Sequence, residues 1–198
     1  MSLIIDNLIK ELCKLPGIGG KTATRLAFYI LKQPEQYALS LANALVDVKN
    51  KVGFCSVCLN LAEKDPCEIC SDNRRDFSVI CVVENPSDIL AIEKTKQFRG
   101  SYHILHGSIS PLDGIVPDDI KIKELLKRLD SSSVHELIIA TNASIEGETT
   151  ALYLTKLLKN RKNDIAITRI ASGIPIGSDL EYVDTSTLSR AFEARRQL

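Results

Sequence analysis

Hydrophobic residues recur every three or four positions in three stretches near the start of the chain, and this period predicts three helices. The first helix is expected from about Asp6 to Lys14, the second begins near Lys21, and the third runs from about Gln36 to Lys51. A segment rich in proline and glycine, residues 15–20, separates the first two helices and predicts a tight turn. We expect the third helix to complete a small helical core through Tyr37, Leu41, Leu45 and Val48.

From residue 77 onward, short apolar runs alternate with helical periods. The runs predict strands at Phe77–Val83, Tyr102–Leu105, Glu136–Ala140 and Ile165–Ile170. Helices are expected after the first strand, at Ile120–Leu129, and through Leu152, Leu157 and Leu158 in a helix opened by residues 141–148, with a last helix at Thr185–Leu198. This alternation implies an α/β layer with a mostly parallel sheet, whose functional edge lies beyond the carboxyl ends of the strands.

Between the two regions lie two Cys-x-x-Cys pairs, Cys55 with Cys58 and Cys67 with Cys70. This spacing predicts one structural zinc per chain with four cysteine ligands, because each pair brings two thiolates to one ion from a tight turn. The segment is too short and polar to bury a core of its own, so the metal would replace one. Two disulfides or a redox Cys-x-x-Cys are the alternatives. A catalytic zinc is disfavoured because four thiolates leave no position for water.

Composition is that of an ordinary soluble globular protein, with 44% hydrophobic residues among 198. No apolar run approaches the roughly 20 residues of a membrane span, and the N-terminus lacks the apolar stretch of a signal peptide. We therefore expect a cytoplasmic protein with reduced thiols and no membrane partner. Cys13 and Cys81 fall in apolar patterns and are expected to be buried.

The formal net charge is zero, so binding to nucleic acid would require a local patch. Residues 15–27, with Lys21 and Arg25 four positions apart, resemble the helix-hairpin-helix DNA-binding motif. A glycine-rich turn that leads into a helix N-terminus offers free N–H groups and a positive dipole end to a phosphate. Gly17 and Gly19 would allow close approach, and Lys21 and Arg25 would extend the contact. The alternatives are a solvated charged face or a P-loop, which would need glycine where Leu15 stands.

Four acidic residues are expected at the carboxyl edge of the sheet. Glu84 and Asp88 follow the first strand, and Glu146 and Glu148 follow the strand at 136–140. They predict a weak Mg²⁺ site, an acidic surface for a partner, or ordinary solvated loop charges.

This region resembles the Toprim domain shared by topoisomerases, primases and some nucleases. That family holds Mg²⁺ with a glutamate after its first strand and an Asp-x-Asp after a later one. Glu84 matches the glutamate, whereas Asn142 and Ser144 stand at the two aspartate positions. Neutral groups there remove much of the field that would hold the ion and stabilise a transition state. The resemblance therefore implies the Toprim fold without Mg²⁺-dependent phosphoryl transfer.

Over nearly its whole length the chain is similar to the RecR family of bacterial recombination mediators, in which the Asp-x-Asp positions are typically degenerate. Its specific marks are the turn at residues 15–19, the four cysteines, His106–Gly114, Ala140–Asn142 with Glu146–Glu148, and Leu180–Asp184. The resemblance implies a non-enzymatic DNA-repair protein, associated with the nucleoid, that forms a homotetrameric ring or a homodimer around single- or double-stranded DNA. With RecO and RecF, such proteins load RecA onto single strands coated by single-strand-binding protein.

We thus expect an α+β multidomain chain. Its parts are a helix-hairpin-helix DNA-binding domain at 1–53, a four-cysteine zinc knuckle at 54–76, a Toprim-like α/β domain at 77–170 and a C-terminal helical assembly segment at 171–198. Lys21 and Arg25 would contact DNA, and the four acids would form the partner-facing surface. The alternatives are a pure interaction scaffold and a Mg²⁺-dependent Toprim nuclease or related phosphoryl-transfer enzyme, which would need Glu146 and Glu148 to replace the missing pair.

Overall fold

The computed structural model describes residues 2–131, 133–159, 165–171 and 173–195. The chain divides into two compact units, Met1–Val52 and Gly53–Leu198. Among the described residues, no helix combines the length and the apolar character needed to cross a membrane.

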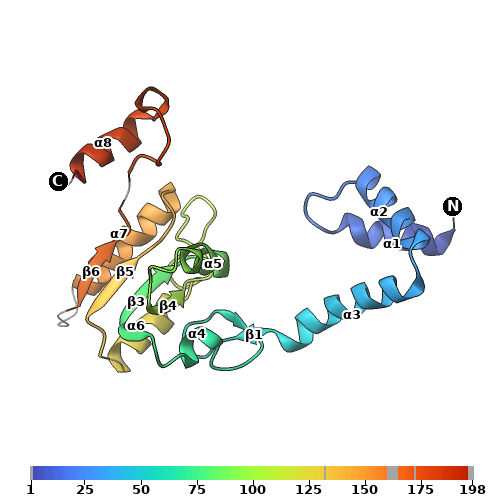
Figure 1. Ribbon diagram of the computed structural model, residues 1–198, viewed down its shortest axis with the longest axis horizontal. Coiled ribbons are helices and arrows are strands. Elements are labelled where there is room, and N and C mark those ends of the chain that lie inside the picture. The colour runs from blue at the N-terminus through green and yellow to red at the C-terminus, as the bar shows by residue number, and fades with distance from the viewer. Residues whose placement is uncertain (1, 132, 160–164, 172, 196–198) are drawn as a thin grey trace. The chain divides into compact units, whose positions relative to one another are not determined.

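The N-terminal unit consists of helices α1 (Leu3–Cys13), α2 (Gly20–Lys32) and α3 (Glu35–Lys51) (Figure 1). Its core is small, because Ala23 and Ala27 of α2 are the only buried residues in these three helices. Short side chains at these positions let α1 and α2 approach closely. The expectation that Cys13 is buried is wrong: it is exposed, since α1 buries none of its residues.

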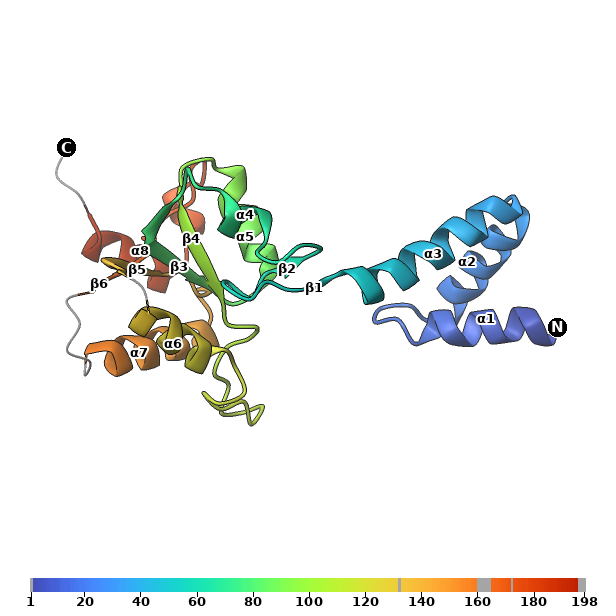
Figure 2. The same ribbon diagram turned by 90° about the horizontal axis from the view of Figure 1, so that it is seen from below.

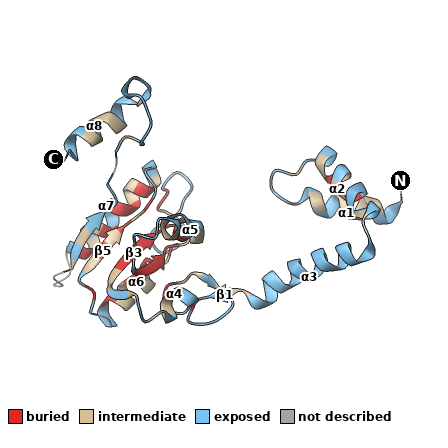
Figure 3. Ribbon diagram, in the orientation of Figure 1, coloured by how far each residue is buried: buried red, intermediate tan, exposed pale blue. Residues whose placement is uncertain are grey.

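The prediction that α3 completes a helical core is also wrong for this chain. The helix forms where it was expected, but none of its residues is buried and its ribbon is exposed along almost its whole length (Figure 3). Leu45, for example, is 65% exposed. Within the N-terminal unit, the Tyr37 ring of α3 meets the Tyr29 ring of α2 edge to face, whereas Leu41, Leu45 and Val48 stay exposed.

The second unit begins with the cysteine segment. A two-stranded antiparallel ribbon, β1 (Gly53–Phe54) and β2 (Leu61–Ala62), is followed by the short helix α4 (Glu68–Ser71). Elements of two and four residues have no detectable hydrophobic period, which is why the sequence pattern did not predict them.

A mostly parallel sheet was expected, and the four-stranded sheet of this unit is parallel throughout, with the order β4-β3-β5-β6. Its strands are β3 (Asp76–Val83), β4 (Gly100–Ile104), β5 (Glu136–Ile139) and β6 (Ala166–Arg169). Leu137 pairs in register with Ile80 on one side and Ile167 on the other.

Helices cover both faces of the sheet. Helices α6 (Ile122–Ser131) and α7 (Ile145–Lys159) lie on one face, and α5 (Pro86–Lys94) lies on the other (Figures 1 and 2). Side chains alternate along β3, so that Ile80 and Val82 join the core under α6 and α7. Cys81 and Val83 join a second core with α5 and three of the metal-site cysteines. The cysteine segment therefore packs on the α5 face of the sheet.

The chain ends with a 3-10 turn (Leu180–Tyr182) and helix α8 (Thr185–Glu193). This helix is shorter than the predicted 185–198, of which residues 196–198 lie outside the described part. It buries none of its residues, and Phe192 is 64% exposed. Its N-terminus is capped by Asp184, whose carboxylate accepts a hydrogen bond of 3.0 Å from the Thr187 N–H.

Candidate zinc centre and nucleic-acid interface

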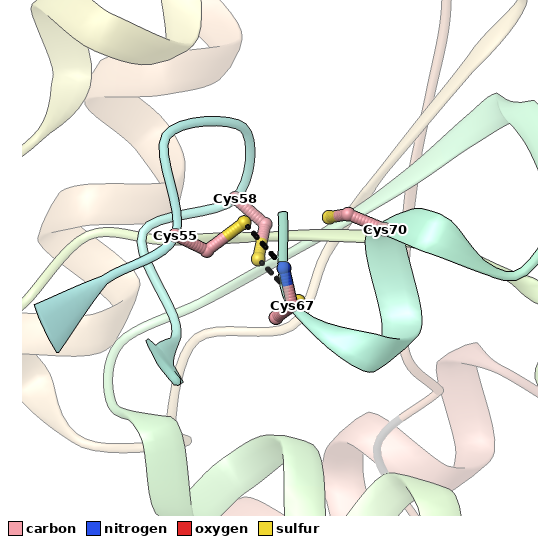
Figure 4. A group of neighbouring side chains, drawn as sticks. All are labelled: Cys55, Cys58, Cys67 and Cys70. Carbon is pink, nitrogen blue, oxygen red and sulfur yellow. Dashed lines mark hydrogen bonds between the residues drawn. The ribbon is translucent and has the colours of Figure 1, made fainter. Parts of the chain in front are cut away.

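The four cysteines converge on one point (Figure 4). Cys55 and Cys58 come from the turn after β1, Cys67 stands at the N-cap of α4, and Cys70 lies within that helix. Their Sγ atoms all lie within 4.8 Å of one another. Among the described residues they are the only group of three or more His, Cys, Asp or Glu side chains close enough to share a metal ion.

Spacing, burial and charge all fit zinc. A Zn–S bond of about 2.3 Å in a tetrahedron places sulfur atoms about 3.8 Å apart, and the Cys58 and Cys67 Sγ atoms are separated by 3.6 Å. Burial raises the pKa of Cys67 to about 11, and the hydrogen bond to Cys58 together with burial raises the pKa of Cys70. The hydrogen bond with Cys70 lowers the pKa of Cys58 to about 5, so the cluster favours one thiolate without a metal, and a divalent cation would stabilise the others. Backbone groups support the site, since the Cys67 N–H donates to the Cys55 Sγ at 3.3 Å.

The glycine-rich turn leads directly into α2. Gly17 has a φ of +78°, a left-handed conformation that favours glycine. Gly19 occupies the N-cap without any capping side chain, and the first turn of α2 holds no acidic residue. Because the first N–H groups of a helix have no partner within it, this end of α2 is open to an anion. An added Cβ at Gly19 would meet no atom within 4 Å, so packing does not explain glycine there and a ligand can approach closely.

Lys21 and Arg25 extend this open end along the first turns of α2. Both side chains are exposed, and neither forms an ion pair or side-chain hydrogen bond with the described part of the chain. The two positive charges are thus available for an external partner, in contrast to Lys14 and Lys51, which are paired with Glu11 and Asp47.

The sheet edge places Glu84 against Asn142. Glu84 is only 5% exposed, and its carboxylate accepts hydrogen bonds from the Asn142 backbone N–H at 2.9 Å and from the Asn142 side-chain amide. Ser144 directly precedes α7, and its hydroxyl accepts a hydrogen bond of 3.1 Å from the Gly147 N–H. At the two aspartate positions, Asn142 therefore binds the Glu84 carboxylate and Ser144 caps α7. Both contacts stabilise the local fold.

The structure does not bring the four expected acids together as one ligand set. Asp88 belongs to the capping box of α5 and accepts a hydrogen bond of 2.8 Å from the Asn85 N–H. Glu148 is paired with Arg169 of β6 and with Arg190 of α8, and these partners lower its pKa. The carboxylate of Glu146 makes no hydrogen bond or ion pair with a described residue.

Two contacts, one made by Glu148 and one by His106, could not be predicted from the sequence. Each joins residues that lie more than 40 positions apart along the chain. The Glu148–Arg190 pair, 42 residues apart, ties α8 to α7, and both Arg190 and Arg169 line a cavity of about 530 Å³ at the sheet edge. His106 is not one of the four clustered ligands, but it contacts residues next to Cys55 and Cys58. Its Nε2 is 2.7 Å from the Leu59 carbonyl oxygen, and its ring meets Phe54 edge to face.

Gly147 should tolerate no side chain. A Cβ there would lie 2.1 Å from the Asn142 carbonyl oxygen and 2.8 Å from the Glu84 carboxylate. We expect Gly147→Ala to lower the free energy of unfolding by about 1–3 kcal/mol, because the backbone under the Glu84–Asn142 contact must shift. Denaturant unfolding checks this value. Gly173→Ala, where a Cβ meets nothing within 4 Å, is the matched control. Equal stability of the two variants would contradict the prediction.

Family models match four consecutive segments of the chain. They describe the RecR helix-hairpin-helix at residues 5–49, the RecR zinc finger domain with four cysteines at 52–72, the Toprim domain at 78–171 and the RecR C-terminal region at 173–196. The zinc-finger match and the four converging cysteines together fit one structural zinc per chain.

Proposed function

This chain belongs to the RecR family, whose domains support a role in recombinational repair, and from this premise we propose that it is a non-catalytic DNA clamp. With RecO and RecF, it loads RecA onto single-stranded or gapped DNA at the nucleoid in the cytoplasm. The observation that carries this proposal is the open, positively charged start of α2, where Lys21 and Arg25 have no described partner.

DNA binding at α2 would be largely independent of sequence. The N–H groups beside Gly19 and the two cations can reach phosphate oxygens, which are the same at every base pair. Gly17 holds the turn that presents them. Such a site suits both single- and double-stranded DNA, and its affinity falls steeply with salt.

The sheet edge supports a role without catalysis. The carboxylate of Glu84 is already satisfied by Asn142, and Ser144 is used as a helix cap. Mg²⁺ would have to compete with these contacts and would find neutral groups where charged ligands are needed. We propose that Asp88, Glu146 and Glu148 instead contribute to a partner-facing surface, with Glu146 the group most available for pairing. Glu84 is buried and would support this surface from below through its hydrogen bonds to Asn142.

Assembly into a homotetrameric ring or a homodimer would cover the open apolar faces. Helix α3 presents Leu41 and Leu45 on one side, and α8 presents Phe192. Open apolar stripes of this kind mark interaction surfaces. We propose that the domain at residues 1–53 binds DNA and forms one assembly face, and that the segment at 54–76 binds the zinc. The domain at 77–170 would form the partner surface, and the segment at 171–198 a second assembly face.

Charges on α3 should dissociate the assembly. We expect Leu41→Glu/Leu45→Glu to shift the mass in solution from that of an oligomer toward that of a monomer, because burying two unpaired carboxylates at an interface costs several kcal/mol. Light scattering after size exclusion measures the mass. Leu90→Glu on α5, where the leucine is 66% exposed, is the control. An unchanged mass for the α3 variant would remove this helix from the interface.

The function itself is tested by reconstitution. Single-stranded DNA coated with single-strand-binding protein is mixed with RecA, RecO and RecF, with and without this chain, and RecA filament growth is followed. We expect growth to accelerate only when the chain is present. No acceleration, or Mg²⁺-dependent DNA cleavage that disappears in Glu84→Ala, would overturn the proposal.

A further inference from the structure

The loop between β4 and α6 holds a leucine almost entirely in water. Leu112 is 97% exposed, the highest value among the leucines of the described residues. It stands at the tip of residues 107–119, which we name the Leu112 loop. Just before the tip, the loop descends into the domain, since Ile109 and Ser110 are both buried.

The Leu112 loop is braced on both sides of its tip. The Ser110 hydroxyl and the Asp113 carboxylate are 2.6 Å apart, and Ser110 also forms an isolated β-bridge with Ile115. The Ile109 N–H donates to the Thr150 hydroxyl at 2.8 Å, which fastens the start of the loop to α7. These contacts support the backbone on both sides of Leu112, whose side chain is exposed.

An exposed leucine here is poorly explained by the stability of the chain alone. It adds nothing to either core, and a polar residue would serve equally well at a solvated turn. An apolar side chain on a braced backbone is, however, suited to recognition, since little backbone freedom remains to be lost on binding. Single exposed leucines are common, so the bracing and the charge around the tip decide the assignment.

The charge of the loop selects the class of partner. Residues 107–119 contain Asp113, Asp118 and Asp119 and no lysine or arginine. Asp119 accepts a hydrogen bond of 2.8 Å from the Val116 N–H, and Asp118 forms an exposed ion pair with Lys123 at 3.2 Å. A surface of this sign repels the DNA backbone and attracts lysine and arginine.

We infer that the Leu112 loop docks a protein partner whose surface offers an apolar pocket edged by lysine and arginine residues. Leu112 enters the pocket, and the three aspartates orient the basic edge. This inference rests on the proposed function and deepens it, because it assigns the anchor of a partner contact to a loop outside the four acids of the sheet edge.

The test uses purified RecO and purified RecF from the same organism as two separate probes. It measures the binding of each probe to the full chain. We expect Leu112→Ala to weaken binding of at least one probe by more than about 10-fold, as truncation of a buried interface anchor does. Leu152→Ala on α7, where the leucine is 70% exposed, is the matched control and should bind as the wild type. Asp118→Asn should slow association and reduce its dependence on salt.

The outcomes separate this inference from the proposed function. Binding of both probes by Leu112→Ala as by the wild type would overturn the inference alone. Failure of the wild-type chain to bind either probe would overturn it together with the partner part of the proposed function. Equal loss in Leu112→Ala and Leu152→Ala would also overturn it, because the effect would not be specific to the loop. Circular dichroism of each variant excludes unfolding as the cause.

Discussion

Replacing Cys58 with serine should release the zinc and strongly destabilise the second unit. A structural zinc contributes folding energy directly, on the order of 10 kcal/mol in small zinc domains. Its loss should extend beyond the cysteine segment, because the Cys58 carbonyl accepts a hydrogen bond of 3.0 Å from the Ile104 N–H of β4. Cys55, Cys58 and Cys67 also share a core with Tyr102 and Ile104. We therefore expect the free energy of unfolding to fall by roughly 5 kcal/mol or more.

Two measurements check this prediction. Elemental analysis should find one zinc per wild-type chain and much less in Cys58→Ser, and denaturant unfolding should give the change in stability. Cys13→Ser is the matched control, because Cys13 is exposed on α1 and belongs to the other unit. Wild-type protein without zinc after native purification would refute the metal assignment. Zinc retained in Cys58→Ser at unchanged stability would remove Cys58 from the ligand set.

Removing the positively charged side chains of Lys21 and Arg25 at the start of α2 should weaken DNA binding and reduce its dependence on salt. Each phosphate contact contributes about 0.9 to the slope of log K against log salt for duplex DNA. Lys21→Ala/Arg25→Ala should therefore lower that slope by about 1.8 and weaken binding by roughly 10-fold or more at low salt. Neither side chain packs in the core or pairs with a described residue, so the fold should be retained. Fluorescence anisotropy across a salt series measures affinity and slope together.

The control for this pair carries the same change in net charge. Lys156→Ala/Lys159→Ala removes two lysines from the last turn of α7, in the other unit. It should leave the slope near the wild-type value. Equal slopes for the α2 double variant and the wild type would place DNA elsewhere on the chain. Absence of binding by the wild type, even on long DNA, would favour a scaffold or a need for a partner protein.

Features encoded over a few neighbouring residues were predictable. The hydrophobic period located the helices and the strands of the parallel sheet to within a few residues, because period depends on local geometry alone. The cysteine spacing located the metal site for the same reason, since two tight turns suffice to bring four thiolates to one ion. The small elements β1, β2 and α4 were missed because they are too short to show a period.

The sequence by itself thus determined the parts of the protein: three helices with an open glycine turn, a four-cysteine segment, and an α/β layer with neutral residues at two acidic positions. The tertiary structure decided how side chains far apart along the chain use one another. It buried Glu84 against Asn142, 58 residues away, paired Glu148 with Arg169 and Arg190, and buried none of the α3 residues in the core of the N-terminal unit. No local pattern encodes these outcomes, because burial and pairing depend on which distant segments fold against each other.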